Sequence, residues 1–97
     1  MACTPIHPGE ILAEELEAAG LRAAELARLV EVPPNRVSQI IAGKRAVTAD
    51  TALRLGRYFG TSAELWLNLQ KMYELDLARA ELGAGLERLP QRPLAET

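Results

Sequence analysis

Four polar side chains that suit the edges of DNA bases lie close together in the middle of the chain. They are Asn35, Arg36, Ser38 and Gln39. Arginine pairs with guanine, and asparagine or glutamine pairs with adenine, through bidentate hydrogen bonds, while serine can bond to either base. Val37, Ile40 and Ile41 alternate with them at the i, i+3, i+4 spacing of one buried helix face. This pattern predicts a short recognition helix over residues 34–42 that turns the four polar side chains toward the major groove of DNA.

Cations flank the recognition helix where the DNA backbone would run. Lys44 and Arg45 follow Gly43, which ends the helix, and Arg22 lies at the start of the preceding helix. Lysine and arginine bind phosphate oxygens and fix the register of a protein on the duplex without reading its sequence. We therefore expect Arg22, Lys44 and Arg45 to bind phosphates, Arg22 together with the free N–H groups at its helix start.

The distribution of charge explains how a chain with a formal net charge of −2 can bind DNA. Residues 21–57 hold seven cations and three anions, a net charge of +4, whereas the remainder holds four cations and ten anions, a net charge of −6. A local positive face attracts a polyanion even when the whole protein is acidic. The acidic flanks predict modest non-specific affinity for DNA and suggest a second, basic partner.

A second short helix and a tight turn precede the recognition helix. The sequence predicts this helix over residues 22–30 and the turn over residues 31–33. In a helix-turn-helix, the first helix crosses the DNA backbone while the N-terminal part of the second reads base edges. The two helices meet at a steep angle, which requires a small residue where they approach, and Ala27 lies there. Residues 22–42 are therefore predicted to form a helix-turn-helix.

Three more helices support this unit. They are predicted over residues 8–19, 49–59 and 63 to about 81. Pro8 suits the first position of a helix, and Thr48 and Ser62 are good N-caps. Glycine follows the first two of these helices as a stop signal. The expected fold is all-α, with five helices.

The C-terminal end differs in composition from the rest of the chain. Residues 82–97 hold two glycines and two prolines with little helical periodicity, so we expect a mobile tail. A length of 97 residues fits one domain, and neither internal repeats nor strand-like alternation occur. Residues 1–81 are therefore predicted to be a single helix-turn-helix domain.

The last predicted helix carries more apolar side chains than one buried face can absorb. Two neighbouring stripes consist of Leu65, Leu69 and Met72, and of Trp66, Tyr73 and Leu77. An exposed apolar patch usually marks an interface, and a two-fold dimer is the commonest solution. A dimer through these residues would place two recognition helices about one turn of DNA, ~34 Å, apart. The alternative is a central helix that is buried on all sides.

Three blocks of sequence carry a family resemblance. They are IHPGEILAEEL, LARLVEVPPNRVSQIIAGKRAVTADTALRLGRYFGTS and ELWLNLQKMYEL, which together span residues 6 to about 78. These blocks resemble the HigA antitoxin family, also called VapI-like or addiction-module antidote proteins, of the lambda-repressor-like (XRE-type) helix-turn-helix class. The resemblance implies a five-helix repressor that dimerises, binds an operator palindrome in its own promoter and neutralises a toxin. That toxin is usually a RelE-like, ribosome-dependent mRNA endonuclease of the HigB type.

The sequence departs from the pattern of this class at two positions. Many relatives carry glycine in the turn, where this chain has Glu31. A non-glycine residue in the left-handed conformation costs about 1 kcal/mol, so we expect the turn to be built differently. Many relatives also begin the helix before the turn with a polar residue that bonds phosphate. This chain has Leu21, Arg22 and Ala23 there, so that contact would pass to Arg22.

Enzymatic and membrane functions find little support. His7 is the only histidine, and Cys3 is the only cysteine. No metal-ligand spacing, phosphate-binding glycine loop or nucleophile–base pair occurs. No apolar run approaches the ~20 residues of a membrane span, and the start has no pattern of a secretory signal. We therefore expect a cytoplasmic protein that is not an enzyme and uses no cofactor or metal.

Two other functions fit the same residues. The chain could be an orphan repressor of the same class, without a toxin. It could also be a toxin-binding module in which DNA binding is secondary, with the acidic face of helix 8–19 or the tail docked on a basic toxin. A pull-down with a co-encoded small basic protein would separate these functions.

Overall fold

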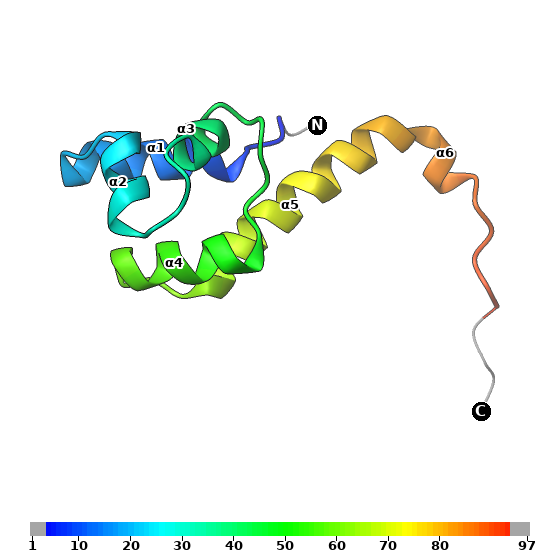
Figure 1. The fold of residues 1–97 in the computed structure, drawn as a ribbon. Coiled ribbons are helices and arrows are strands. Elements are labelled where there is room, and N and C mark those ends of the chain that lie inside the picture. Colours follow the sequence, from blue (N-terminus) through cyan, green and yellow to red (C-terminus); the bar gives the residue numbers. More distant parts are fainter. Residues whose placement is uncertain (1–3, 94–97) are drawn as a thin grey trace.

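The computed structural model describes residues 4–93 and consists of helices and their connections, with no strand in that range (Figure 1). The helices are α1 (Pro8–Ala19), α2 (Ala23–Leu29), α3 (Arg36–Ile41), α4 (Ala49–Phe59), α5 (Ala63–Leu82) and α6 (Ala84–Glu87). The predicted all-α fold is confirmed. The predicted count of five omits α6, because a single four-residue turn is too short to show a helical period.

Local signals set the ends of the longer helices where the sequence predicts them. The His7 Nδ1 atom accepts a hydrogen bond from the Gly9 N–H at 2.9 Å, and Pro8 occupies the first helical position of α1. Thr48 and Ser62 cap α4 and α5 through their hydroxyl oxygens. These caps satisfy N–H groups that have no partner inside the helix. The predicted starts of α1, α4 and α5 are therefore confirmed.

The recognition helix α3 begins two residues later than the sequence predicts. Pro33 precedes Pro34 and is therefore disfavoured in the helical region, which agrees with its predicted place in the turn. Asn35 has φ −93° and ψ 1°, outside the α-helix. The Arg36 N–H donates to the Pro33 carbonyl at 2.9 Å, which is an i to i−3 turn bond. Pro34 and Asn35 therefore form a turn before the helix.

The core lies where α1 to α4 meet the first half of α5. Its fully or almost fully buried apolar side chains are Leu12, Leu16, Leu26, Ala27, Val37, Ile40, Val47, Ala52, Leu55 and Trp66. Trp66 is only 1% exposed, and its indole N–H donates to the Thr61 hydroxyl at 3.0 Å. The prediction that Trp66 lies at a dimer interface is wrong, because this face of α5 packs against α4 and the core.

The second half of α5 leaves the body of the domain. Figure 1 shows α5 running away from the other helices toward α6. Beyond Gln70, no residue of α5 is buried. Exposed apolar side chains on this half and on α6 include Met72, Leu75, Leu77, Leu82 and Leu86. The alternative of a helix buried on all sides is therefore wrong. Whether the tail beyond α5 is mobile stays a prediction, and residues 94–97 lie outside the described range, as does Cys3.

Backbone packing between α1 and α3 requires a glycine. A Cβ atom built at Gly9 would overlap the carbonyl oxygen of Ile40 and approach the Ile41 Cα atom to 2.9 Å. The start of α1 therefore lies directly on the backbone of the last turn of α3. Only a residue without a side chain fits between the two helices.

Gly9→Ala is expected to force α1 and α3 apart and to lower the free energy of unfolding by about 1–3 kcal/mol, the usual cost of overpacking. Urea denaturation followed by circular dichroism measures this change. Gly85→Ala is the matched control, because its Cβ would meet only the Arg88 guanidinium at 3.7 Å. Equal stability of the Gly9→Ala variant and the control would contradict the close packing.

His7 is a buried titratable group that supports α1. The side chain is 8% exposed, and its ring lies edge-on to Tyr73 of α5, with ring centroids 4.7 Å apart. Burial lowers the pKa of His7, and the nearby charge of Glu10 raises it by less. Because the folded state disfavours the protonated ring, the stabilisation is complete above the unfolded value of 6.5. The stabilisation is lost as pH falls from 6.5 through the lower pKa of His7 in the folded state.

The free energy of unfolding is therefore expected to decrease as pH falls from 7.5 to 5, because the unfolded chain binds a proton that folded His7 resists. His7→Asn keeps an N-cap acceptor but does not titrate in this range. Urea denaturation at several pH values should give a shallower dependence for this variant. An equal slope for both chains would show that His7 does not control the dependence.

Candidate nucleic-acid interface

The turn between α2 and α3 contains a left-handed residue that is not glycine. Glu31 has φ 61° and is the only non-glycine residue with positive φ among residues 4–93. Its N–H donates to the Arg28 carbonyl at 3.3 Å, and the Val32 N–H donates to the Ala27 carbonyl at 3.0 Å. This pair of bonds is a Schellman motif, the usual way to end a helix at a left-handed residue. The turn thus keeps the geometry that glycine normally provides, and the expectation of a different turn is wrong.

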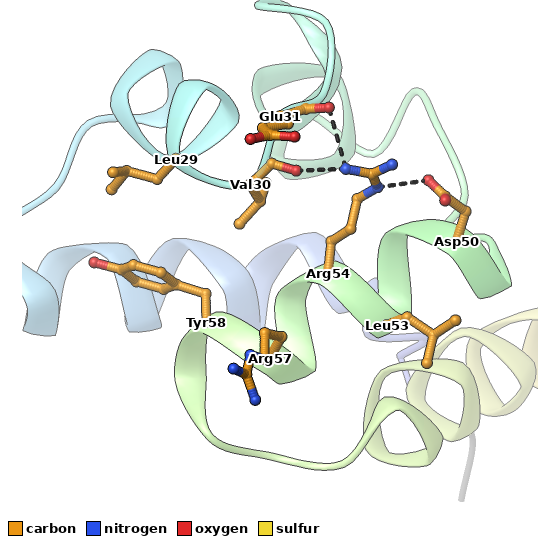
Figure 2. Close-up of a pocket in the computed structure, with 8 residues that line it drawn as sticks. All are labelled: Leu29, Val30, Glu31, Asp50, Leu53, Arg54, Arg57 and Tyr58. Atoms are coloured by element: carbon orange, nitrogen blue, oxygen red, sulfur yellow. Dashed lines mark hydrogen bonds and ion pairs between the residues drawn. The ribbon is translucent and has the colours of Figure 1, made fainter.

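Arg54 of α4 holds this turn. Its Nη1 atom donates to the carbonyl oxygens of Val30 at 2.8 Å and Glu31 at 3.2 Å, while Nε donates to Asp50 Oδ2 at 3.0 Å. Figure 2 shows the guanidinium reaching from α4 to the turn, at the edge of an open groove that also exposes Leu53. From the sequence, Arg54 was only one of the seven cations of residues 21–57. The i, i+4 pair of Asp50 and Arg54 was the one sign of its role.

Three of the four predicted base-contacting residues share an outward face of α3. Asn35, Ser38 and Gln39 are spaced i, i+3, i+4, which places them side by side. Asn35 and Ser38 are exposed, and the Ser38 hydroxyl donates to the Asn35 carbonyl at 3.0 Å. Gln39 is half-buried, and its Oε1 accepts from the Arg45 Nε at 3.0 Å. The predicted base-reading and phosphate-binding groups therefore meet at the end of α3.

Arg36, the fourth predicted residue, points elsewhere. Its Nη1 lies 3.5 Å from the Thr51 hydroxyl of α4, and its Nε is buried without a hydrogen-bond partner. Ile40 follows four residues later on nearly the same side of the helix, so Arg36 lies at the edge of the buried face. The expectation that burial of the apolar face turns Arg36 outward is wrong. A buried donor without a hydrogen-bond partner costs free energy. Movement of the Arg36 guanidinium to a new acceptor would therefore be favourable.

The loop after α3 is fixed from α5 by a buried amide. Gln70 is 5% exposed, and its Oε1 accepts from the Val47 N–H at 2.8 Å. Its Nε2 donates to Glu74 Oε2 at 3.0 Å, and this bond, with a second from Lys71, lowers the pKa of Glu74. Lys44 and Arg45 are exposed in the same loop. Gln70 was not among the residues predicted from the sequence, although a glutamine at i+4 from Trp66 in an apolar stripe was a usable signal of burial.

Arg22 lies at the N-cap of α2 with its side chain 87% exposed. Its N–H donates to Glu25 Oε1 at 2.8 Å, and its Nε lies 3.6 Å from the same oxygen. The backbone hydrogen bond is the main reason that the pKa of Glu25 is lowered, with the Arg22 charge contributing less. Glu25 therefore occupies part of the helix start, so a phosphate would compete with this carboxylate for Arg22.

The six predicted dimer residues separate into three groups. Leu65, Met72 and Leu77 are 42%, 62% and 45% exposed. Leu69 and Tyr73 are half-buried, Leu69 against the core and Tyr73 against His7. Trp66 belongs to the core. Exposed apolar side chains also continue toward the C-terminus at four positions that were not predicted, Leu75, Leu82, Leu86 and Leu89.

Other kinds of site find no support in the described part of the chain. Among residues 4–93, no group of three or more His, Cys, Asp or Glu side chains could hold a metal ion. Within the same range, every helix is too short or too polar to cross a membrane.

Comparisons with known proteins point in the same direction. A family model described as Helix-turn-helix matches residues 12–66. Virulence-associated protein I of Dichelobacter nodosus is 52% identical over 77 residues, covering 78% of this chain and 71% of the relative. An addiction module antidote protein of the HigA family from Coxiella burnetii is 47% identical, with a TM-score of 0.88 over 94% of this chain and 100% of its own. Pseudomonas aeruginosa antitoxin HigA, solved with the higBA promoter, is 44% identical, with a TM-score of 0.87 and the same coverage.

Proposed function

Because this chain belongs to the HigA family of helix-turn-helix antitoxins, we propose that it is the antitoxin of a toxin–antitoxin module and represses its own operon. The observation that carries the DNA-binding part is the outward face of α3, where Asn35, Ser38 and Gln39 adjoin Lys44 and Arg45. The similarity to a HigA solved with the higBA promoter supports DNA binding by this chain. A repressor acts where its operator DNA lies, so this chain is proposed to act in the cytoplasm.

Two groups of side chains in and around α3 would contact DNA in different ways. Asn35, Ser38 and Gln39 contact base edges in the major groove, and Arg22, Lys44 and Arg45 bind phosphates. The bond from Arg45 orients the Gln39 amide, whose oxygen keeps a second lone pair and whose NH₂ group can donate to adenine. Arg36 would contact a base only after leaving Thr51. Its contribution to sequence preference is therefore expected to be smaller than that of Gln39.

Gln39→Ala and Lys44→Ala are expected to affect DNA binding in different ways. Gln39→Ala should lower the preference for DNA from upstream of its own gene over a scrambled fragment by about 5- to 150-fold, since a good base contact contributes ~1–3 kcal/mol. Lys44→Ala should weaken binding to both fragments equally and lower the salt slope by about one unit. Fluorescence anisotropy at several salt concentrations measures both effects.

Lys71→Ala is the matched control for Lys44→Ala, because Lys71 is an exposed lysine on α5. It should leave both affinities nearly unchanged. An unaltered sequence preference in Gln39→Ala would remove Gln39 from the base-contacting face. Failure of the wild-type chain to prefer its own upstream DNA would overturn the proposed autorepression.

We also propose that two copies pair through the exposed apolar side chains of α5. Met72 and Leu75 are 62% and 50% exposed, and Leu65, seven residues before Met72, extends the same face. Leu77 is 45% exposed on another side of the helix. Exposure of these apolar side chains to water is unfavourable. A second copy packed against them would remove that exposure. A two-fold dimer also matches a palindromic operator, because it presents two recognition helices.

Met72→Glu combined with Leu75→Glu is expected to convert the dimer into a folded monomer and to weaken operator binding. The two carboxylates would have to lose their hydration in the apolar interface. Sedimentation equilibrium at micromolar concentration measures the mass, and circular dichroism checks the fold. Leu53→Glu is the control, because Leu53 is 64% exposed on α4, away from this surface. A wild-type monomer that binds the palindrome tightly would contradict the proposal.

The proposed toxin is a RelE-like mRNA endonuclease of the HigB type, as the family resemblance implies. The exposed carboxylates Glu14 and Glu17 on α1 support a basic partner. Co-expression with the neighbouring open reading frame, followed by affinity purification and a translation assay, tests this assignment. A stable complex that relieves translational arrest is expected. No complex with the neighbouring product would favour the orphan repressor instead.

A further inference from the structure

Arg54 closes the turn of the helix-turn-helix from outside that motif. It lies on α4, 23 residues beyond Glu31 in sequence, yet its Nη1 donates to the carbonyls of Val30 and Glu31 (Figure 2). These carbonyls follow the last turn of α2, where the helix dipole concentrates negative charge. A cation that donates hydrogen bonds here both neutralises that charge and satisfies backbone acceptors. The contact therefore fixes the backbone at the exit of α2.

The guanidinium is itself held in place. Its Nε donates to Asp50 Oδ2 at 3.0 Å, one helical turn earlier on α4. The side chain of Arg54 is 37% exposed and that of Asp50 is 65% exposed. The guanidinium group is rigid and planar, so a hydrogen bond that fixes one of its nitrogens also orients the other two. A lysine ammonium group cannot reproduce this arrangement. The stem of Arg54 thus links α4 to the turn in one defined orientation.

The turn needs such a link because Glu31 is strained. At φ 61° a side chain with a Cβ atom crowds the following carbonyl, which is the carbonyl that Arg54 binds. Release of this carbonyl would let Glu31 relax toward negative φ. The backbone would then change direction four residues before Asn35, the N-cap of α3. Since α3 has only six residues, a change at its start would move its whole outward face.

We propose that Arg54 is a positioning residue for operator recognition, which holds the strained turn at Glu31 so that α3 enters the major groove at the correct angle. This inference rests on the proposed function, because it assumes that α3 binds DNA. Arg54 acts through the turn and makes no phosphate contact. Its loss should therefore reduce operator affinity without the change in salt slope that loss of a phosphate-binding cation causes. Glycine at position 31 should make Arg54 dispensable.

The test compares Arg54→Met, Glu31→Gly and the double variant with the wild-type chain. Methionine keeps most of the aliphatic stem and removes the donors. Arg54→Met is expected to weaken binding to the chain's own upstream DNA about tenfold with the salt slope unchanged. Glu31→Gly alone should bind at least as tightly as wild type, because glycine adopts positive φ without strain. The double variant should recover most of the affinity that Arg54→Met loses.

Arg57→Met is the matched control. It makes the same substitution and charge change three residues later on α4, and Arg57 makes no hydrogen bond or ion pair among the described residues. It should leave operator affinity within about twofold of wild type. Amide hydrogen exchange gives a second measurement that does not involve DNA. Exchange of the Val32 amide should accelerate in Arg54→Met and return toward the wild-type rate in the double variant.

Several results would overturn the inference. Operator affinity of Arg54→Met equal to wild type would remove the positioning role, and a salt slope lower by one unit would make Arg54 a phosphate contact. A loss that Glu31→Gly does not rescue would separate Arg54 from the turn. If Arg54→Met does not fold, Arg54→Lys carries the same test with a smaller expected loss. Failure of the wild-type chain itself to bind its upstream DNA would instead overturn the proposed function.

Discussion

Backbone contact between Gly9 and Ile40 fixes the place of the recognition helix. A helix of six residues, such as α3, is too short to be stable alone in water, where isolated helices need roughly 12–15 residues. It exists because Val37 and Ile40 are buried and because the start of α1 lies directly on its last turn. The His7 cap and the glycine at position 9 allow that approach. The first residues of the described chain therefore determine where the side chains proposed to bind DNA lie.

Polar anchors from the later helices hold both ends of α3. Arg54 of α4 binds the turn before it, and Gln70 of α5 binds the loop after it. Each anchor satisfies a backbone group in a segment without regular structure, where unpaired groups would be costly. The outward face thus combines a short helix with two immobilised connections. This arrangement suits recognition, which depends on placing donors and acceptors before DNA arrives.

The anchor at Gln70 also connects the DNA-binding loop to the surface proposed for dimerisation. Gln70 is the last buried residue of α5, and Met72 begins the exposed apolar half of the same helix. The helix has 20 residues, which corresponds to about 30 Å at 1.5 Å per residue. Gln70 and Met72 are only two residues apart on this helix, so a second copy packed on the apolar side chains would lie next to the residue that anchors the loop. In the proposed dimer, α5 would therefore help to set the distance between the two loops that carry Lys44 and Arg45.

Residues with local determinants were predictable from the sequence, and residues with tertiary partners were not. Caps at Thr48 and Ser62 act on their own helix, so the starts of α4 and α5 were predicted correctly. The late start of α3 reflects the turn formed by Pro34 and Asn35, which the spacing of the apolar residues does not reveal. Trp66 was misassigned because two apolar stripes on one helix look alike until the neighbouring helix is known. The position of Gln70 in an apolar stripe was a local sign that it is buried, but its partner Val47 lies 23 residues away, so the contact itself could not be predicted.

Glu31 and Arg36 depart from simple sequence rules for a common reason. Both lie beside the outward face of α3, and both are held by residues of α4, Glu31 through Arg54 and Arg36 through Thr51. A left-handed glutamate and a buried, unpaired guanidinium nitrogen each raise the energy of the unbound state. Strain of this kind persists only where surrounding contacts maintain it, and it concentrates at functional sites. Because α4 supplies those contacts, the specificity of α3 depends on a helix that lies outside the helix-turn-helix motif.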